Sequence, residues 1–394
     1  MARFLFSGNI FLLTNLLLFS FELFSQKNTP VYDVKIHTGK VVQNWLSDSF
    51  PQRNASLYFE FNWAKQTLDS KSWPASYNFP QTGISFMVGS NGNPTELGYT
   101  FGVVPNVTFG TLNNRKWRIK LSLGMGLAYL TKPYDSITNK ENVLIGSHIT
   151  NLSYAQLYFQ RQLNDKWTAS FGFSTLHASN GHYQIPNVGM NIPCIAVGVK
   201  YYPTNRPKLP METDTFVKIK NRIRINAKVG FGIHEFAETT KPIGGPKYNV
   251  YVGQLYLSRL YGRTSNVHAG FSWKYYTDYY KFLKDNQVFQ ENLHLKSSVF
   301  SFFLGHEFMF GQFAFLTQGA LDLYFPQYIP YNDLIGKEGG FSYFVERYFS
   351  TRIGLQYYAN NLAKNSSHGL FFGIYVNANF GEADFVETGI GYSF

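Results

Sequence analysis

Residues 117–129 read WRIKLSLGMGLAY, and this stretch decides the fold class. Its odd-numbered positions, from Trp117 to Tyr129, are apolar, whereas its even-numbered positions are charged, polar or small. Residues 222–233 repeat this period of two, with polar or small residues at even positions and apolar ones at odd positions. Such alternation is typical of a β-strand with one apolar face. In a membrane barrel that face contacts lipid and the polar face lines the lumen.

Similar segments recur to the end of the chain. We expect strands near 82–90, 97–111, 116–130, 148–162, 166–179, 190–203, 222–235, 247–260, 265–279, 294–309, 312–325, 341–357, 367–380 and 384–394. Short turns, such as Asn164-Asp165 and Phe310-Gly311, alternate with longer links, as bacterial outer-membrane barrels require. The link at 204–221 is an exception, because it is long where a short periplasmic turn is expected. The fold class is therefore all-β: an antiparallel transmembrane outer-membrane β-barrel of about 14 strands, with 12 or 16 as alternatives.

The composition favours the same class. Aromatic residues make up 18% of the chain and charged residues only 15%, whereas soluble domains carry roughly 25% charge. Aromatic girdles at two membrane interfaces explain this balance. The net charge of +11 favours anionic partners, and phosphorylated lipid headgroups suit an exported protein. No basic run or nucleic-acid motif is present, so nucleic acid is not an expected partner.

The N-terminal sequence indicates export. Residues 1–25 combine a basic start, an apolar run and a small residue, Ser25, as a signal peptide does; a membrane anchor is the alternative. Residues 26–81 are expected to be a periplasmic or strand-pairing segment, in which 55–64 resembles a strand and could pair near 31–38. Residues 82–394 would form the barrel. The alternating C-terminus, which ends at Phe394, resembles the signal read by outer-membrane assembly machinery.

Three polar residues interrupt the apolar face of two predicted strands. His177 and Ser179 continue the apolar parity of the strand that begins near Trp167, and Asn191 shares the apolar parity of the next strand. If strand geometry persists, all three lie on the lipid-facing wall near the outer rim. Exposing polar groups to lipid costs free energy, and this cost favours a functional role for the three residues.

These residue types suit ester hydrolysis. A serine hydroxyl becomes a good nucleophile when a histidine takes its proton, and a third group must hold the imidazole tautomer. Ser179, His177 and Asn191 can fill these three roles. Asn180, Asn187 or the backbone N–H of Gly181 could stabilise an oxyanion. The alternative is a polar turn at the headgroup level, because such residues are ordinary turn formers.

The same residues carry a family resemblance. A His-x-Ser-Asn-Gly run followed by Pro-Asn-x-Gly resembles the signature of the lipid A 3-O-deacylase (PagL-type) family, and residues 145–203 resemble the Bacteroidetes proteins named acyloxyacyl hydrolases. The resemblance implies an outer-membrane barrel whose lipid-facing wall hydrolyses an ester-linked acyl chain of lipid A, with His177 and Ser179 catalytic. It implies no cofactor. The family has Glu at the position of Asn191, so the chain departs from the pattern there.

Glu235, the histidines and the single cysteine carry three further expectations. Parity and strand order place Glu235 on the strand next to Asn191, where its negative charge could polarise Asn191 and stabilise the imidazolium of His177; a solvated loop residue is the alternative. The scattered histidines form no metal-ligand cluster, and the single cysteine, Cys194, is expected to be a buried lumen residue.

The competing function is a non-catalytic barrel, a pore or surface-binding protein, in which the lumen cations at 118, 120, 222, 224 and 228 favour anions. The oligomeric state is left open.

Overall fold

The structure is a computed structural model. It describes residues 29–43, 50–69, 72–111, 116–209, 222–236, 238, 243–337, 339–360, 362, 368–379 and 381–394. The predicted signal peptide, the turn at 113–114 and most of the link at 204–221 lie outside these residues. No helix within the described ranges has both the length and the apolar character needed to cross a membrane.

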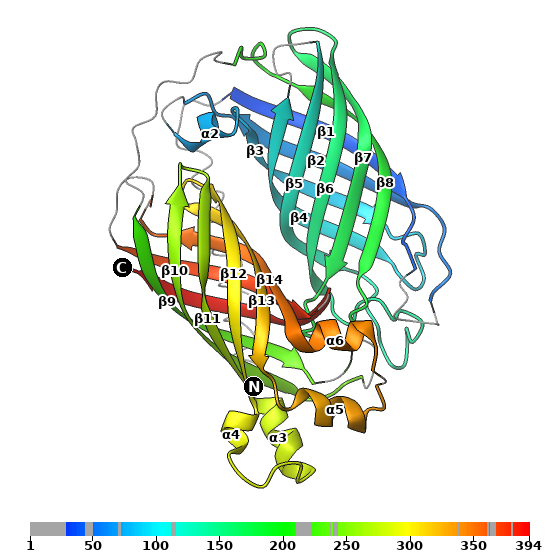
Figure 1. Ribbon diagram of the computed structural model, residues 1–394. Coiled ribbons are helices and arrows are strands. Elements are labelled where there is room, and N and C mark those ends of the chain that lie inside the picture. The colour runs from blue at the N-terminus through cyan, green and yellow to red at the C-terminus, as the bar shows by residue number, and fades with distance from the viewer. Residues whose placement is uncertain are drawn as a thin grey trace. The chain divides into compact units, whose positions relative to one another are not determined.

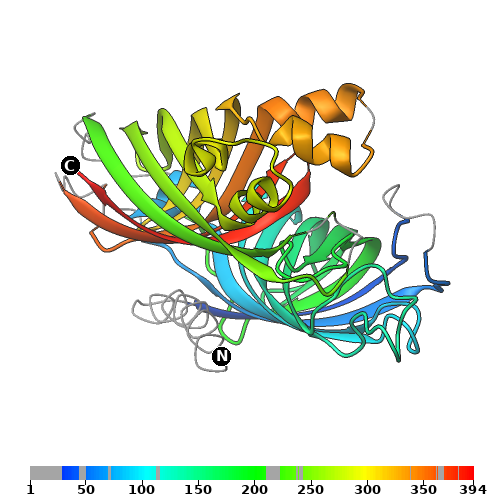
Figure 2. The same ribbon diagram turned by 90° about the horizontal axis from the view of Figure 1, so that it is seen from below.

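The chain forms two closed, eight-stranded antiparallel barrels (Figures 1 and 2). The first barrel closes where β1 pairs with β8. It contains β1 (Thr29–Gly39), β2 (Ser56–Gln66), β3 (Gln81–Ser90), β4 (Tyr99–Thr111), β5 (Trp117–Leu130), β6 (Ile149–Gln162), β7 (Trp167–Ser179) and β8 (Met190–Tyr201), with the short helix α2 (Trp73–Ser76) between β2 and β3.

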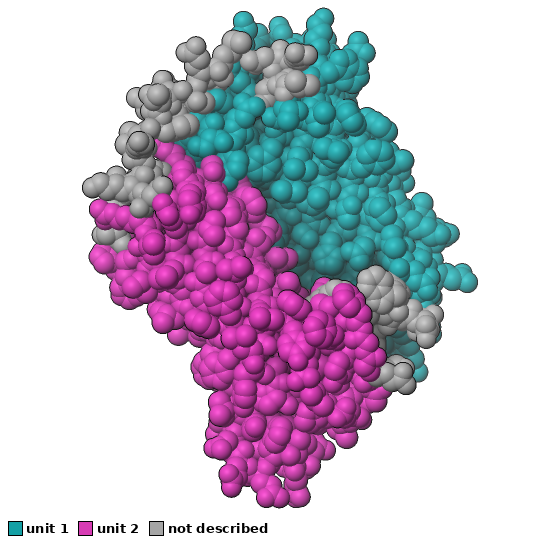
Figure 3. All heavy atoms as spheres, viewed as in Figure 1, with its two compact units in different colours: residues 1–180, 184–216, 239–241 teal, residues 181–183, 217–238, 242–394 magenta. Residues whose placement is uncertain are grey.

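The second barrel closes where β16 pairs with β9. Its strands are β9 (Ile223–Glu235), β10 (Lys247–Tyr261), β11 (Ser265–Tyr276), β12 (Ser298–Phe310), β13 (Phe313–Tyr324), β14 (Phe349–Tyr358), β15 (Gly369–Asn379) and β16 (Glu382–Ser393). Four helices lie in its longer connections: α3 (Thr277–Asp285), α4 (Leu293–Lys296), α5 (Tyr328–Leu334) and α6 (Phe341–Tyr348). Figure 3 colours the two compact units into which the chain divides.

The prediction of strands is confirmed, but the prediction of one barrel of about 14 strands over 82–394 is wrong. All 14 predicted segments contain a strand, and β1 and β2 raise the total to 16. The strand at 55–64 pairs with residues 29–39, one of the two expected possibilities for it. Because β8 turns back to pair with β1, the sheet closes before β9 begins. Residues 341–348, expected as strand, form α6 instead.

The alternating faces are as predicted. On β5 the odd-numbered side chains from Trp117 to Leu123 are exposed, whereas Arg118, Lys120 and Ser122 are buried toward the lumen. β9 repeats this arrangement from residue 223 to 229. An apolar exterior around a polar interior is the reverse of a soluble protein and is typical of a barrel in lipid.

A buried hydrogen-bond network centred on Glu60 of β2 fills part of the lumen of the first barrel. Its carboxylate accepts hydrogen bonds from Lys35 Nζ at 3.0 Å, Ser85 Oγ at 2.6 Å and Gln156 Nε2 at 3.0 Å, and lies 2.9 Å from His37 Nε2. A buried carboxylate is tolerated when such partners surround it. This network connects β1, β2, β3 and β6 across the interior.

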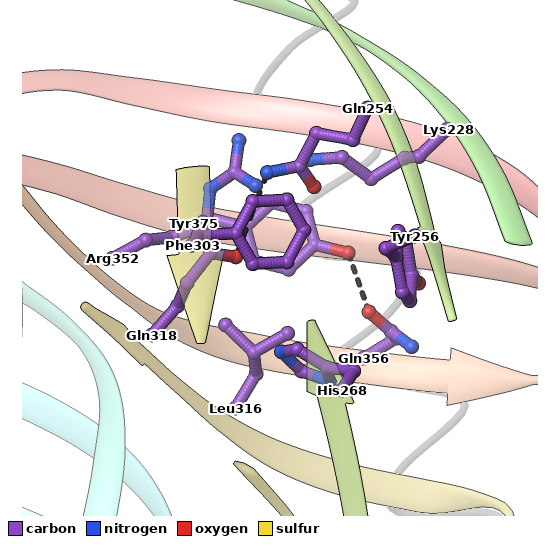
Figure 4. A pocket seen from close by; sticks show the side chains of 10 residues that line it. All are labelled: Lys228, Gln254, Tyr256, His268, Phe303, Leu316, Gln318, Arg352, Gln356 and Tyr375. Atoms are coloured by element: carbon purple, nitrogen blue, oxygen red, sulfur yellow. Dashed lines mark hydrogen bonds between the residues drawn. The ribbon is translucent and has the colours of Figure 1, made fainter. Parts of the chain in front are cut away.

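The second lumen is likewise occupied by side chains. Glu387 of β16 pairs with Lys228 of β9 and Arg352 of β14. Figure 4 shows Lys228 and Arg352 beside Tyr375, with Gln356 accepting a 2.7 Å hydrogen bond from the tyrosine hydroxyl. Eight-stranded barrels have an interior just wide enough for side chains to fill. These contacts oppose the idea of a wide aqueous pore.

Candidate active site

Strands β7 and β8 carry the three predicted catalytic residues. His177 and Ser179 lie at the end of β7. Both side chains are half-buried, whereas the even-numbered side chains of the strand are buried. Asn191 is the second residue of β8, and its register partner is His177. The exposed side chains further along these two strands include Phe171, Phe173, Ile195 and Val197. The parity argument is therefore confirmed: the three polar residues share the apolar outer face of the first barrel.

The structure brings His177 and Asn191 into direct contact. His177 Nδ1 lies 2.7 Å from Asn191 Oδ1. An amide oxygen only accepts hydrogen bonds, so Nδ1 carries the proton and donates it. This contact leaves Nε2 as the unprotonated nitrogen of the neutral ring. The ring therefore has the tautomer that a general base at Nε2 requires.

Ser179 contacts the loop that follows β7. Its Oγ donates a 3.2 Å hydrogen bond to Asn187 Oδ1. Asn187 Oδ1 also accepts a 2.9 Å hydrogen bond from the backbone N–H of Asn180. Asn187 is thus a link between the end of β7 and the loop, a role that the sequence did not predict. Because its oxygen faces Ser179, only its Nδ2 group can serve as the predicted oxyanion donor.

The loop from 180 to 189 has a defined shape. Asn180 Nδ2 donates to the carbonyl of Gln184 at 2.6 Å, and the peptide bond between Ile185 and Pro186 is cis. Gly181 has a φ of 66° and Gly189 a φ of 79°, a region that favours glycine. A Cβ at Gly189 would stand 3.5 Å from His177 Cε1, so the loop backbone passes close to the imidazole.

The argument that placed Glu235 beside Asn191 is wrong. It assumed that β9 pairs with β8, whereas β8 pairs with β7 and β1, and β9 pairs with β10 and β16. The Glu235 carboxylate accepts the backbone N–H of Gly245 at 2.8 Å. Glu235 is also buried rather than solvated, so the alternative of a solvated loop residue is wrong as well.

One other expectation can be compared with the structure. Cys194 is buried on the lumen-facing parity of β8, as predicted. Among the described residues, no group of three or more His, Cys, Asp or Glu side chains is arranged to hold a metal ion.

Comparison with solved structures gives matches at low similarity. OccK5 (OpdH) of Pseudomonas aeruginosa is 11% identical, with a TM-score of 0.22, and the match covers 93% of this chain and 97% of that one. OccAB3 of Acinetobacter baumannii is 9% identical, with a TM-score of 0.23 and coverage of 93% and 98%. TM-scores this low say nothing about the site. A search of curated proteins found no match to this chain.

A protein-family model covers the part of the chain that holds the candidate site. The match begins in β2 and ends in β8, and so includes every strand of the first barrel except β1. The family consists of ester hydrolases that act on lipid A, which supports both an outer-membrane location and a deacylase activity. Residues 57–200, which carry His177, Ser179 and Asn191, match the model of the lipid A 3-O-deacylase (PagL) family.

Proposed function

We propose that the first barrel is an outer-membrane esterase that removes an ester-linked acyl chain from lipid A by a Ser-His mechanism. The observation that carries the proposal is the 2.7 Å contact between His177 Nδ1 and Asn191 Oδ1 on the apolar outer face. A lipid substrate reaches this face from the membrane plane without leaving the bilayer. The resemblance to the Bacteroidetes acyloxyacyl hydrolases supports the same substrate class.

The reaction proceeds in two displacements. Ser179 Oγ attacks the ester carbonyl while His177 Nε2 takes the hydroxyl proton. As the tetrahedral intermediate collapses, the C–O bond to the glycolipid breaks, and the imidazolium returns the proton to the departing alkoxide. Water then attacks the acyl-serine, again with His177 as the base, and releases the fatty acid. For the first step, Ser179 must exchange its hydrogen bond to Asn187 for one to His177.

The developing oxyanion needs donors near Ser179. The side-chain amide of Asn187 is the proposed donor. Asn180 is not a proposed oxyanion donor. Its backbone N–H donates to Asn187 Oδ1, and its side-chain amide donates to the carbonyl of Gln184. One such donor typically contributes roughly a hundredfold to kcat.

Asn191 provides the first test. Asn191→Ala removes the acceptor that fixes the His177 tautomer, and we expect kcat for lipid A deacylation to fall about a hundredfold with little change in KM. Asn191→Glu supplies an acceptor with a negative charge, which stabilises the imidazolium. We expect this variant to exceed the natural protein in kcat by about tenfold.

The control is a polar change on the neighbouring strand of the same outer face, at the register partner of Ser179. Asn151→Ala on β6 removes a side chain whose amide donates to the carbonyl of Gly126 rather than to His177. It should leave kcat near its original value. Equal kcat values for Asn191→Ala and the natural protein would show that the histidine is oriented without Asn191.

The lumen cations test the competing function. Arg118 and Lys120 are buried toward the lumen of the first barrel, and Arg118 Nη2 donates to Gln162 at 2.8 Å. The double change Arg118→Gln and Lys120→Gln should leave deacylation within about twofold, because neither side chain shares the face of His177. Lipid A mass spectrometry measures deacylation, and planar-bilayer recording measures conductance. A large loss of deacylation would mean that the active site lies in the lumen.

A further inference from the structure

Helices α5 and α6 form the connection between β13 and β14 of the second barrel (Figure 1). One side of α6 is bonded to α5 and the segment that follows it. The Tyr343 ring packs edge-on against Tyr328 with centroids 4.9 Å apart, and the Tyr328 hydroxyl donates to the Tyr343 carbonyl at 3.0 Å. Glu346 forms an ion pair with Lys337 at 2.5 Å. Tyr343 and Glu346 of α6 thus face other parts of the same connection.

The opposite side of α6 is aromatic and open. Phe341 is 76% exposed and Phe344 is 52% exposed. The Phe344 ring contacts Tyr348 at 5.0 Å and Phe349 at 6.4 Å between centroids. Positions 341, 344 and 348 share one helical face because of the helix period. A helix that pairs its glutamate with its own connection and exposes its phenylalanines is reversed relative to a helix in water.

This aromatic side continues the apolar wall of the barrel. Phe349 is the first residue of β14 and pairs in register with Leu321 of β13, and both are exposed. Ile353 and Leu355 extend the exposed apolar face along β14. We name the surface formed by Leu323, Phe341, Phe344, Tyr348 and Phe349 the rim patch. Phe349 belongs both to this patch and to the exposed face of β14, which contacts lipid in an outer-membrane barrel.

We propose that the rim patch is a lipid-binding surface and that α6 lies in the membrane interface, with its aromatic side in the boundary between headgroups and acyl chains. This inference rests on the outer-membrane location that belongs to the proposed function. The long connections of such barrels are extracellular, so the lipid is the phosphorylated glycolipid of the outer leaflet. Arg347, whose guanidinium lies 5.1 Å from the Tyr348 ring centroid, provides the cation for its phosphates.

Site-directed spin labelling measures this directly. The full chain has one cysteine, the buried Cys194, so Cys194→Ser gives a background without other thiols. Phe344→Cys and, separately, Phe341→Cys place a nitroxide on the rim patch in nanodiscs of phosphatidylethanolamine and lipopolysaccharide. We expect each label to be more accessible to oxygen than to a water-soluble nickel chelate, at a depth of about 5–10 Å below the phosphates.

Two positions in the same barrel calibrate the depth. Lys281→Cys on α3 carries a side chain that is 57% exposed and ion-paired with Asp285, and its label should be accessible to the nickel chelate. Leu304→Cys in the middle of β12 lies on the outer wall with 60% exposure, and its label should be the deepest. The heat-dependent gel shift of a folded barrel checks each variant.

The outcomes separate the two proposals. Labels at 341 and 344 that are as accessible to the nickel chelate as the label at 281 would overturn the lipid-binding surface, whatever the deacylase activity. A label at 304 that is open to the nickel chelate would overturn the membrane location itself. Intermediate depths at 341 and 344 would support the inference even if lipid A is not hydrolysed.

Discussion

Replacing Ser179 with alanine is expected to lower the rate of lipid A deacylation about a thousandfold or more while the barrel stays folded. The hydroxyl of Ser179 is the proposed nucleophile, and without it no acyl-serine can form. His177→Ala should cost a similar factor, because the hydroxyl is a poor nucleophile without its base. The double variant should be no worse than either single variant, since the two residues act as a unit.

Ser153 provides a matched control for this prediction. It lies on β6, half-buried, and its register partner on β7 is His177. Ser153→Ala should therefore retain activity if Ser179 is the nucleophile. Both variants can be compared by mass spectrometry of lipid A from cells that express them, with the gel shift as the check of folding. Loss of activity in Ser153→Ala but not in Ser179→Ala would assign the nucleophile to β6.

The sequence predicted strands and faces well because both are local properties. A period of two needs only a few neighbouring residues, and it located all 14 segments as well as the outward side of His177. Strand count and closure are not local. The first barrel closes through pairs such as Val34 with Val199, which lie far apart in the chain. No turn signal or hydrophobic pattern indicates such a pair.

The errors at Glu235 and at residues 341–348 both concern contacts between separate segments of the chain. Glu235 was placed next to Asn191 by counting strands in order, and that count fails where the sheet closes on β1. Residues 341–348 belong to the predicted strand 341–357, but they form α6 instead. Their helical face becomes evident only from the contacts of Tyr343 and Glu346 with α5 and Lys337.

The contact between His177 and Asn191 could be predicted in part from the sequence. The sequence supplied the parity of both residues, and the short loop between β7 and β8 placed them on adjacent strands. Their register follows from the length of that loop, residues 180–189. The role of Asn187 was not predictable in the same way, because its hydrogen bonds depend on the path of the loop backbone.

The largest effect on stability is expected at Glu60, because several buried groups depend on its carboxylate. Glu60→Ala would leave Lys35, His37 and Gln156 facing a cavity without their common acceptor. Removing one partner of a buried ion pair typically costs about 3–5 kcal/mol. Asp33, 3.4 Å from Lys35 Nζ, offsets part of this cost.

Urea unfolding in detergent micelles, followed by the gel shift, measures this loss. Glu60→Gln keeps one carbonyl acceptor and the side-chain volume, and it should be less destabilised than Glu60→Ala. Glu141→Ala in the exposed connection between β5 and β6 is the matched control, and it should unfold at the same urea concentration as the natural protein. If Glu60→Ala also unfolds there, the network does not stabilise the first barrel. Since Glu60 faces the lumen and His177 the outer wall, folded Glu60→Gln should still deacylate lipid A, which separates the stability of the barrel from its chemistry.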